Sequence, residues 1–389
     1  MGDPEAMKQE LVGRARELVP LLAEEAQPSE ALRRPSDRAM DAIEEAEIFK
    51  LMVPRCYGGF ELDMDAFVDV VLTLSEGDAS LSWVTSFLIE HNWMLCLFPE
   101  SFQKEIFRHH SYVLAPGMIT PTGKATPTKG GVRLNGRWQF ATGVSRSTWI
   151  IAGGILREED DTFDPRFFAV PREQVRVEDT WNVDGMCGTG SHDVVIEDLF
   201  VPDEQSVSIV DMNQGTTPGS KIHAGPLYRT PMLPLLCTAA SMPSLGTART
   251  CVRTYGERLP NRKRMGFGPN QAELPDAQAR FARASIGVDQ AELLLRDTVR
   301  ELCALRDAAV PAQRIQMQAR FAMVVDQCRQ LIGQVCAASG ASAHHLGDPL
   351  QRARRDVEVM ACHIAFDLES NLQNAGRVML GLDPAGPMA

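Results

Sequence analysis

Residues 181–202 read Trp-Asn-Val-Asp-Gly-Met-Cys-Gly-Thr-Gly-Ser-His-Asp-Val-Val-Ile-Glu-Asp-Leu-Phe-Val-Pro, and this stretch says most about the fold. Its first half is rich in glycine, as a dinucleotide-binding loop would be. Its second half, from Asp193 to Glu197, predicts a strand, whereas the dinucleotide fingerprint must open a helix. The stretch therefore predicts a turn that leads into a β-strand, and it is no fingerprint for a nicotinamide cofactor.

The chain divides into three regions that differ in composition and in the spacing of apolar residues. Residues 8–112 carry apolar side chains at helical spacing, as at Leu11, Ala15 and Leu18. Residues 115–207 are rich in proline, glycine and β-branched residues. After residue 233 the pattern is helical again. Strands are predicted at 132–140, 149–156, 167–170 and 194–201, and long helices at 235–260, 273–306, 312–339 and 350–380.

The order of helices, then strands, then helices predicts an α+β fold. We expect an N-terminal α-helical domain over 1–114 and a middle β-barrel or sandwich domain over 115–207. A linker loop over 208–232 would then lead to a C-terminal four-helix bundle over 233–389.

Composition excludes several classes of protein. The chain has 389 residues, of which 44% are hydrophobic and 23% charged, which is the balance of an ordinary globular protein. Its formal net charge of -12 argues against nucleic acid as a main partner. No apolar stretch is long enough to predict a membrane span. Nine cysteines without a C-x-x-C pair predict reduced thiols in a cytoplasmic protein, and no ligand spacing predicts a metal site.

Four stretches together resemble the acyl-CoA dehydrogenase fold over nearly the whole chain. They are 134–143 with 147–149, 181–202, Pro349–Arg352 with Arg355-Asp356, and Ala375–Pro384. Within that fold, the run Gly-Thr-Gly-Ser-His-Asp at 188–193 and the ending at 375–384 resemble the oxygenase components of two-component flavin-dependent monooxygenases. That branch is similar to the large component of 4-hydroxyphenylacetate 3-hydroxylase, and to indole and dibenzothiophene monooxygenases.

One position separates this branch from the dehydrogenases. Acyl-CoA dehydrogenases use a glutamate as base, and alignment on Arg355-Asp356 puts that glutamate at Ile364, where there is no carboxylate. The oxygenase branch places a substrate-facing histidine here, and His363 matches it. The alternative for His363 is an ordinary histidine on an amphipathic helix.

The resemblance implies further site residues. His91 would lie near the substrate, although a core histidine is an equal alternative. Thr142 would contact the flavin at N5 and take part in catalysis, or would simply end a strand. Trp149 would pack beside the flavin ring, or would be a β-core tryptophan. The full flavin-binding set that the resemblance implies is Thr142, Ser147, Trp149, Thr189, Ser191, Arg264 and Arg377.

The implied activity is hydroxylation of a small aromatic compound, a phenol or an indole, by O2. The implied cofactor is reduced FAD, with FMN possible, delivered by a separate NAD(P)H-dependent flavin reductase and oxygenated to a C4a-hydroperoxyflavin. His363 would accept the substrate's proton near neutral pH. The family forms homotetramers. The alternatives are oxygenation at nitrogen or sulfur, an acyl-CoA dehydrogenase or oxidase, and a member that binds flavin or a partner without catalysis.

Overall fold

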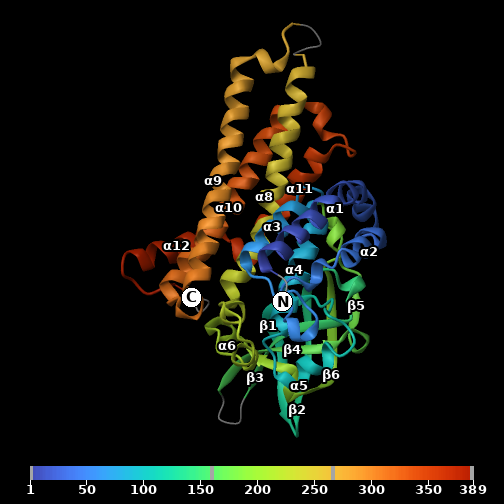
Figure 1. The fold of residues 1–389 in the computed structure, drawn as a ribbon, viewed down its shortest axis with the longest axis vertical. Helices are drawn as coiled ribbons and strands as arrows, with labels where there is room; N and C mark the ends of the chain where they lie inside the picture. The colour runs from blue at the N-terminus through green and yellow to red at the C-terminus, as the bar shows by residue number, and fades with distance from the viewer. Residues whose placement is uncertain (1–2, 158–161, 264–267, 386–389) are drawn as a thin grey trace.

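The computed structural model describes residues 3–157, 162–263 and 268–385, and the predicted α+β order is confirmed (Figure 1). The N-terminal helices are α1 (Pro4–Leu32), α2 (Asp37–Glu45), α3 (Met64–Leu74), α4 (Ala79–Leu95) and α5 (Glu100–Ile106). The strands are β1 (Gly117–Thr128), β2 (Gly131–Ala141), β3 (Trp149–Arg157), β4 (Phe163–Pro171), β5 (Arg176–Glu178), β6 (His192–Pro202) and β7 (Ser206–Ser208). The remaining helices are α6 (Ile209–Gln214), α7 (Pro218–Ile222), α8 (Met232–Arg258), α9 (Pro275–Leu305), α10 (Pro311–Ala338), α11 (Pro349–Ala361) and α12 (Leu368–Met379).

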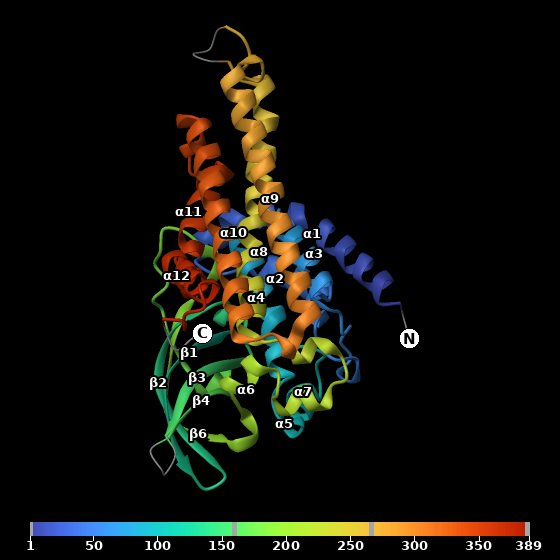
Figure 2. The same ribbon diagram turned by 90° about the vertical axis from the view of Figure 1, so that its left-hand side faces the viewer.

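Helix α4 lies at the centre of the N-terminal region, and every one of its residues is buried. Asp78 caps it by accepting a hydrogen bond from the backbone N–H of Leu81 at 2.9 Å. Apolar side chains lie on all sides of α4, which is the pattern of a helix surrounded by protein. It packs against α8, so the N-terminal and C-terminal helices share one core (Figures 1 and 2).

The middle region forms one seven-stranded sheet in the order β5-β6-β2-β1-β3-β4-β7. All neighbouring pairs are antiparallel except β1 and β3, which are parallel. The sheet has a second core of its own, built around Trp138 and Phe168. The pairing of β2 with β6 shifts register between Trp138 and Ala141, and Phe140 within that shift has a φ of 67°. This irregularity at the end of β2 turns the Phe140 side chain outward, where it is 62% exposed.

The predicted linker loop differs from the structure. Residues 208–232 contain α6, α7 and a 3-10 turn at Pro226–Arg229. Ser208 and Thr217 cap the two short helices with their hydroxyls, which accept hydrogen bonds from the N–H groups of Asp211 and Ser220.

The prediction of four long C-terminal helices is wrong for the fourth. The segment 350–380 forms two helices, α11 and α12, separated by a 3-10 turn at Ile364–Phe366. His363 has an extended backbone, with φ -63° and ψ 137°, and its side chain accepts a hydrogen bond from the N–H of Ala365. Asp367 then caps α12 through the N–H of Ser370. Two capping side chains four residues apart thus start the 3-10 turn and then α12.

Across the ranges that the structure describes, no helix is long and apolar enough to cross a membrane.

Candidate active site

A cavity of about 580 Å³ lies where α4, the β1–β2 part of the sheet, the loop before β6 and the end of α11 meet. Its walls are mostly apolar and aromatic, with a few polar groups. The residues that line it are Trp83, Phe87, His91, Gly117, Met118, Ile119, Thr120, Thr122, Arg137, Trp138, Gln139, Phe140, Thr142, Trp181, Met186, Thr189, Ser191, Leu236, Val359, Met360, Cys362, His363 and Ile364.

One wall is helical and brings two distant histidines together. Trp83, Phe87 and His91 recur every four residues along α4 and therefore share one face. The ring centroid of Phe87 lies 5.6 Å from that of His91 and 6.2 Å from that of His363. Trp83 meets His363 edge to face, with centroids 5.6 Å apart. Phe87 thus separates the two histidines, and Trp83 supports the second.

The proton position on His91 follows from its partner. Its Nδ1 lies 2.7 Å from the carbonyl oxygen of Ala115, which can only accept, so Nδ1 carries the hydrogen and Nε2 has a lone pair. Nε2 is buried and has no hydrogen-bond partner among the described residues. Burial lowers the pKa of His91 to about 4, so the ring is neutral near pH 7.

A buried carboxyl group lies beside this histidine. Oε2 of Glu90 is 3.3 Å from Nε2 of His91, and neither carboxyl oxygen of Glu90 has a hydrogen-bond partner within the described ranges. Burial raises the pKa of Glu90 to about 8, so this group is mainly a neutral acid at pH 7. Glu90 was not among the predicted site residues, since nothing in its spacing marks it as unpaired.

The proton position on His363 is the opposite of that on His91. Nδ1 of His363 accepts the backbone N–H of Ala365 at 3.3 Å, so the hydrogen of the neutral ring lies on Nε2. The surrounding protein lowers the pKa of His363 to about 4. The two histidines are therefore both neutral, and their Nε2 atoms differ: one accepts a hydrogen bond and the other donates one.

Another part of the cavity wall carries a row of three hydroxyl groups. Thr142 Oγ1 lies 2.9 Å from Ser191 Oγ, and Ser191 Oγ lies 2.8 Å from Thr189 Oγ1. The hydroxyl of Thr189 donates to the carbonyl oxygen of Met186 at 2.9 Å. Thr189 and Ser191 are almost fully buried, whereas Thr142 is half-buried at the cavity wall.

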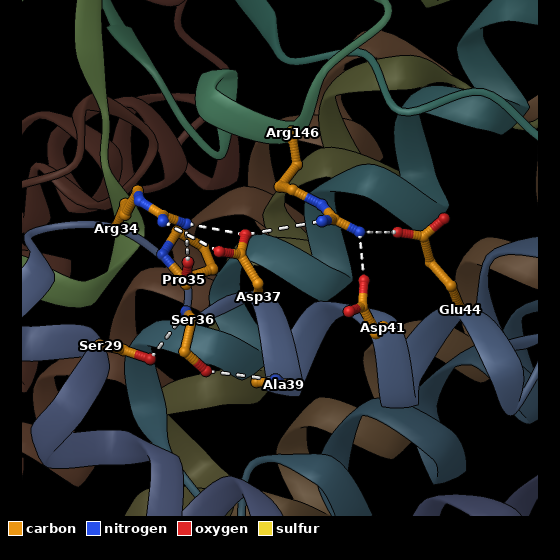
Figure 3. Close-up of polar contacts among 9 residues, drawn as sticks. All are labelled: Ser29, Arg34, Pro35, Ser36, Asp37, Ala39, Asp41, Glu44 and Arg146. Carbon is orange, nitrogen blue, oxygen red and sulfur yellow. Dashed lines mark hydrogen bonds and ion pairs between the residues drawn. The ribbon is translucent and has the colours of Figure 1, made fainter.

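The loop that follows Thr142 is tied to α2 by ion pairs (Figure 3). The guanidinium of Arg146 lies 2.5 Å from Asp41, 2.9 Å from Glu44 and 3.5 Å from Asp37. The backbone N–H of Gly143 also donates to the carbonyl oxygen of Thr189 at 2.9 Å. Thr142 is therefore held between α2 and the loop before β6.

The loop before β6 is held from the other side by α11. The carboxylate of Asp356 accepts the N–H of Met186 at 2.5 Å, and Arg355 donates to the carbonyl oxygen of Asp184 at 2.6 Å. A Cβ atom at Gly185 would lie 2.2 Å from the carbonyl oxygen of Arg355, so only glycine fits there. The Arg355-Asp356 pair in the sequence thus positions the wall that carries the hydroxyl row.

The structure brings five of the predicted site residues to one cavity: His91, Thr142, Thr189, Ser191 and His363. Three others lie elsewhere. Ser147 donates to the carbonyl oxygen of Val144. Trp149 packs edge to face on Phe102, at 5.3 Å between centroids. Arg377 donates to the carbonyl oxygen of Asp383. Arg264 lies outside the described residues.

The aromatic pair at the cavity wall was also missed. Phe140 and Trp181 meet edge to face with centroids 6.1 Å apart, and both line the cavity. Both lie within stretches that carry the family resemblance, and Phe140 stands two residues before Thr142. A large apolar side chain close to a predicted site residue, at the end of a predicted strand, is the signal that could have identified Phe140. The sequence alone does not show whether such a side chain faces the core or the cavity.

The side chains that line the cavity carry no uncompensated charge. Among the described residues that line it there is no carboxylate, and the only cation is Arg137, which pairs with Asp193 at 2.8 Å. The carboxylate base of an acyl-CoA dehydrogenase is thus lacking among these described lining residues, and Ile364 stands at the position where the alignment would put it. The described ranges also contain no group of three or more His, Cys, Asp or Glu side chains placed to hold a metal ion.

Comparison with known proteins identifies relatives over nearly the full length. The family model described as "Acyl-CoA dehydrogenase, C-terminal domain" matches residues 238–368. The flavin-dependent monooxygenase oxygenase subunit HsaA of Rhodococcus jostii (strain RHA1) is 33% identical over 359 residues, which cover 90% of this chain and 93% of that protein. The oxygenase component of an FADH2-dependent resorcinol hydroxylase of Rhizobium sp. (strain MTP-10005) is 31% identical and covers 97% and 95% of the two chains.

A solved structure confirms the predicted fold. The structure of XiaF from Streptomyces sp. in complex with FADH2 and glycerol superposes with a TM-score of 0.91 at 26% identity, over 99% of this chain and 98% of that one. The acyl-CoA dehydrogenase-like fold that the sequence predicted is therefore the fold of this chain.

Proposed function

Because the chain belongs to the oxygenase components of the two-component flavin-dependent monooxygenases, which use reduced flavin, we propose that it hydroxylates a small, uncharged aromatic compound with O2. The observation that carries this proposal is the pair of neutral histidines of opposite hydrogen-bonding character on an otherwise aromatic wall.

The residues of the cavity fit a reduced flavin ring. Such a ring is flat and apolar on its faces and polar along one edge. Phe140 and Trp181 offer aromatic surface, and the hydroxyl row that ends at Thr142 offers a polar edge. When bound, reduced flavin supplies the activation of O2. We favour FAD over FMN because one relative is named as FADH2-dependent and one solved structure holds FADH2, and we infer that a separate NAD(P)H-dependent reductase delivers it.

The two histidines have different roles toward the substrate: one accepts a hydrogen bond and the other donates one. Nε2 of His91 carries a lone pair and has no hydrogen-bond partner within the described ranges, so we assign it to accept the O–H or N–H hydrogen of a phenol or indole. Nε2–H of His363 donates, so it holds an oxygen atom. The sequence had suggested that His363 is the base, but its second nitrogen is already used to accept the N–H of Ala365. Apolar walls exclude water from both.

The charge inventory of the cavity supports an uncharged substrate. A carboxylate buried there would meet no unpaired cation among the described lining residues, since Arg137 already faces Asp193. Removing a charge from water without a partner costs several kcal/mol. A phenol or indole without an acidic side chain is therefore the substrate class that fits.

The first test follows the reoxidation of reduced flavin. Anaerobically reduced FAD, with and without the protein, is mixed with oxygenated buffer in a stopped-flow instrument, and flavin absorbance is recorded. The expected result is reoxidation much slower than that of free flavin, together with hydroxylated product when a neutral phenol is present. Reoxidation at the rate of free flavin, with no product from any phenol or indole, would overturn the proposal.

We further propose that the protein is a cytoplasmic homotetramer associated through its C-terminal helices. Ile286 and Leu293 on α9 are 56% and 65% exposed, and Leu380 after α12 is 79% exposed. Large apolar side chains exposed on a helix surface are typical of interfaces. Nine free cysteines are consistent with a reducing compartment. Light scattering on the wild type should give four times the 42.8 kDa chain mass, and Leu293→Asp should lower it; a monomeric wild type would contradict the proposal.

A further inference from the structure

A second and much smaller cavity, of about 40 Å³, lies where the turn between α3 and α4 meets α8 and α11, and we call it the junction cavity. Its lining includes the carboxyl groups of Asp78 and Asp356 and the hydroxyl of Thr247. None of these three residues is part of the wall of the active-site cavity. The junction cavity is therefore a separate place in the fold, to which the proposed function assigns no role.

The hydroxyl of Thr247 is the group that points to a ligand. Thr247 on α8 is 5% exposed, and its Oγ1 is buried without a hydrogen-bond partner among the described residues. Thr238 on the same helix shows the usual arrangement, since its hydroxyl donates to the carbonyl oxygen of Pro234 at 2.9 Å. Because an unpaired buried hydroxyl is costly, we expect Thr247 to bind an atom that occupies the junction cavity.

The two carboxyl groups are buried, and each has a second oxygen for a ligand. Asp78 and Asp356 are 6% and 3% exposed. Asp78 accepts the N–H of Leu81 with one oxygen, and Asp356 accepts the N–H of Met186 with one oxygen. The second oxygen of Asp78 lies 3.7 Å from Nε of Arg352, which is too long for a hydrogen bond.

The charges around the junction cavity leave one negative charge without a partner. Glu76 also lines it, but its carboxylate pairs with Arg253 at 2.7 Å. Arg352 faces Asp78, whereas Asp356 makes no ion pair within the described ranges. A buried carboxylate without a paired cation is costly, so a proton or a bound cation should neutralise it.

We propose that the junction cavity binds a monovalent alkali cation, sodium or potassium, between Asp78, Asp356 and Thr247. Carboxylate and hydroxyl oxygens are the ligands that hard cations prefer. A single unpaired negative charge suits a monovalent ion, because a divalent ion would leave a buried positive charge. This site goes beyond the proposed function and does not depend on it, since it requires no flavin and no substrate.

A cation at this position would join the two walls of the active-site cavity from behind. Asp78 caps α4, the helix that carries His91. Asp356 holds the loop before β6 through the N–H of Met186. One ion bound by both carboxyl groups therefore connects that helix to that loop, and its binding stabilises the folded arrangement of both.

A proton competes with the cation for Asp356. Burial raises the pKa of Asp356 to about 7, with the charge of Asp78 adding to the rise. Asp356 is therefore mostly ionised at pH 8, where it can hold a cation, and mostly neutral at pH 5.5, where it cannot. Two neighbouring thiols stay neutral throughout, because burial raises their pKa. The titratable and charged groups around Asp356 are Asp78 before α4, Arg352 and Arg355 on α11, Glu30 on α1, Cys187 in the loop before β6 and Cys251 on α8.

The experiment measures the thermal unfolding midpoint of the full-length protein in KCl, NaCl or choline chloride at equal ionic strength. Choline is too large for the junction cavity and controls for ionic strength. At pH 8 the midpoint should be at least about 2 °C higher in one of the two alkali salts than in choline chloride, because an ion that binds only the folded chain stabilises it. At pH 5.5 the difference should vanish. The alkali salt with the larger shift identifies the ion.

Thr247→Val removes the hydroxyl and keeps the shape of the side chain. A series of salt concentrations should show that it weakens the affinity for the ion about tenfold. Thr238→Val is the matched control, since it is the same change on the same helix at a residue that does not line the junction cavity, and it should keep the wild-type affinity. Equal midpoints of the wild type in all three salts at pH 8 would overturn the proposal. An ion affinity of Thr247→Val equal to that of the wild type would overturn it as well.

Discussion

Gly117 and His91 are in such close contact that a Cβ atom added at Gly117 would lie 2.8 Å from Nε2 of His91. Gly117→Ala should therefore displace the ring and weaken its bond to the carbonyl oxygen of Ala115. We expect hydroxylation to fall at least about tenfold, because the proton acceptor is misplaced. Gly13→Ala is the control, since an added Cβ there meets nothing within 4 Å. Product yield per flavin oxidised measures the effect, and equal yields for both variants would contradict it.

His363 should be required for hydroxylation across the neutral pH range. His363→Ala should lower the single-turnover hydroxylation rate about 100-fold, with residual activity from the rest of the site. Cys362→Ala, which changes the neighbouring cavity residue, is the control. Because burial lowers the pKa of His363 to about 4, its neutral form persists from pH 8 to about pH 5. The wild-type rate should stay level over that range in a protein that remains folded, and a fall centred at pH 6.5 would contradict this assignment.

Glu90 should make the fold less stable in alkali. In the unfolded chain its pKa is ordinary, and burial raises it to about 8 in the folded chain. The stability due to the neutral acid is thus complete below about pH 4.5 and is lost as the pH rises through 8, at up to about 1.4 kcal/mol per pH unit. Glu90→Gln should remove this loss, so its unfolding midpoint should fall less than that of the wild type between pH 6 and pH 9. Glu17→Gln on the exposed side of α1 should behave like the wild type, and parallel curves for all three would refute the prediction.

Arg146 should matter for flavin binding although it does not line the cavity. Its ion pairs with Asp41 and Glu44 hold the loop that begins at Thr142. Arg146→Ala should weaken reduced FAD binding about tenfold and lower the free energy of unfolding by about 1 kcal/mol. Arg38→Ala on α2, the helix that also carries Asp41 and Glu44, breaks ion pairs with Glu24 and Glu25 and should leave flavin binding unchanged. Equal affinity of both variants for reduced FAD would show that flavin binding does not depend on the ion pairs of Arg146.

The neutral cavity should discriminate between phenols by charge. We expect 4-ethylphenol to bind the protein–reduced FAD complex at least about 100-fold more tightly than 4-hydroxyphenylacetate, which carries a carboxylate. The amide of the same acid should bind like the neutral phenol. Ile364→Arg, at a position that lines the cavity and is 54% exposed, should improve binding of the carboxylate selectively. Equal affinities for all three ligands, measured anaerobically by calorimetry, would refute the charge argument.

The sequence predicted the architecture well where a single local pattern decides the structure. The apolar strands near 149–156 and 194–201 are β3 and β6, because a run of β-branched residues bounded by turns has few alternatives. Strand β1 was missed, since Gly117–Thr128 is rich in threonine, proline and glycine and is defined by its two neighbours in the sheet. The break at His363 was missed because Asp367 and His363 act as caps only in that backbone conformation.

The site could be predicted only in part for a related reason. Residues within motif stretches, such as Thr142, Ser191 and His363, do meet at one cavity. Trp149 packs on Phe102 instead, because its side chain lies on the face of β3 that packs against the main core. The residue pattern of a strand does not reveal which face of the sheet borders the cavity. The proton positions on the two histidines depend on the carbonyl of Ala115 and the N–H of Ala365, which are backbone groups that no residue type reveals.

The interruption between α11 and α12 has a consequence for how such an enzyme changes over evolution. A residue inside a packed helix is constrained by neighbours on every turn, so new side chains there cost stability. Cys362 and Ile364 lie between the two helices and are outside that constraint, since both are exposed and both are part of the cavity wall. Mutations in this short segment can therefore reshape the chamber that meets the substrate while the bundle keeps its packing. Substrate range and fold stability are thereby governed by different residues, so each can change during evolution without changing the other.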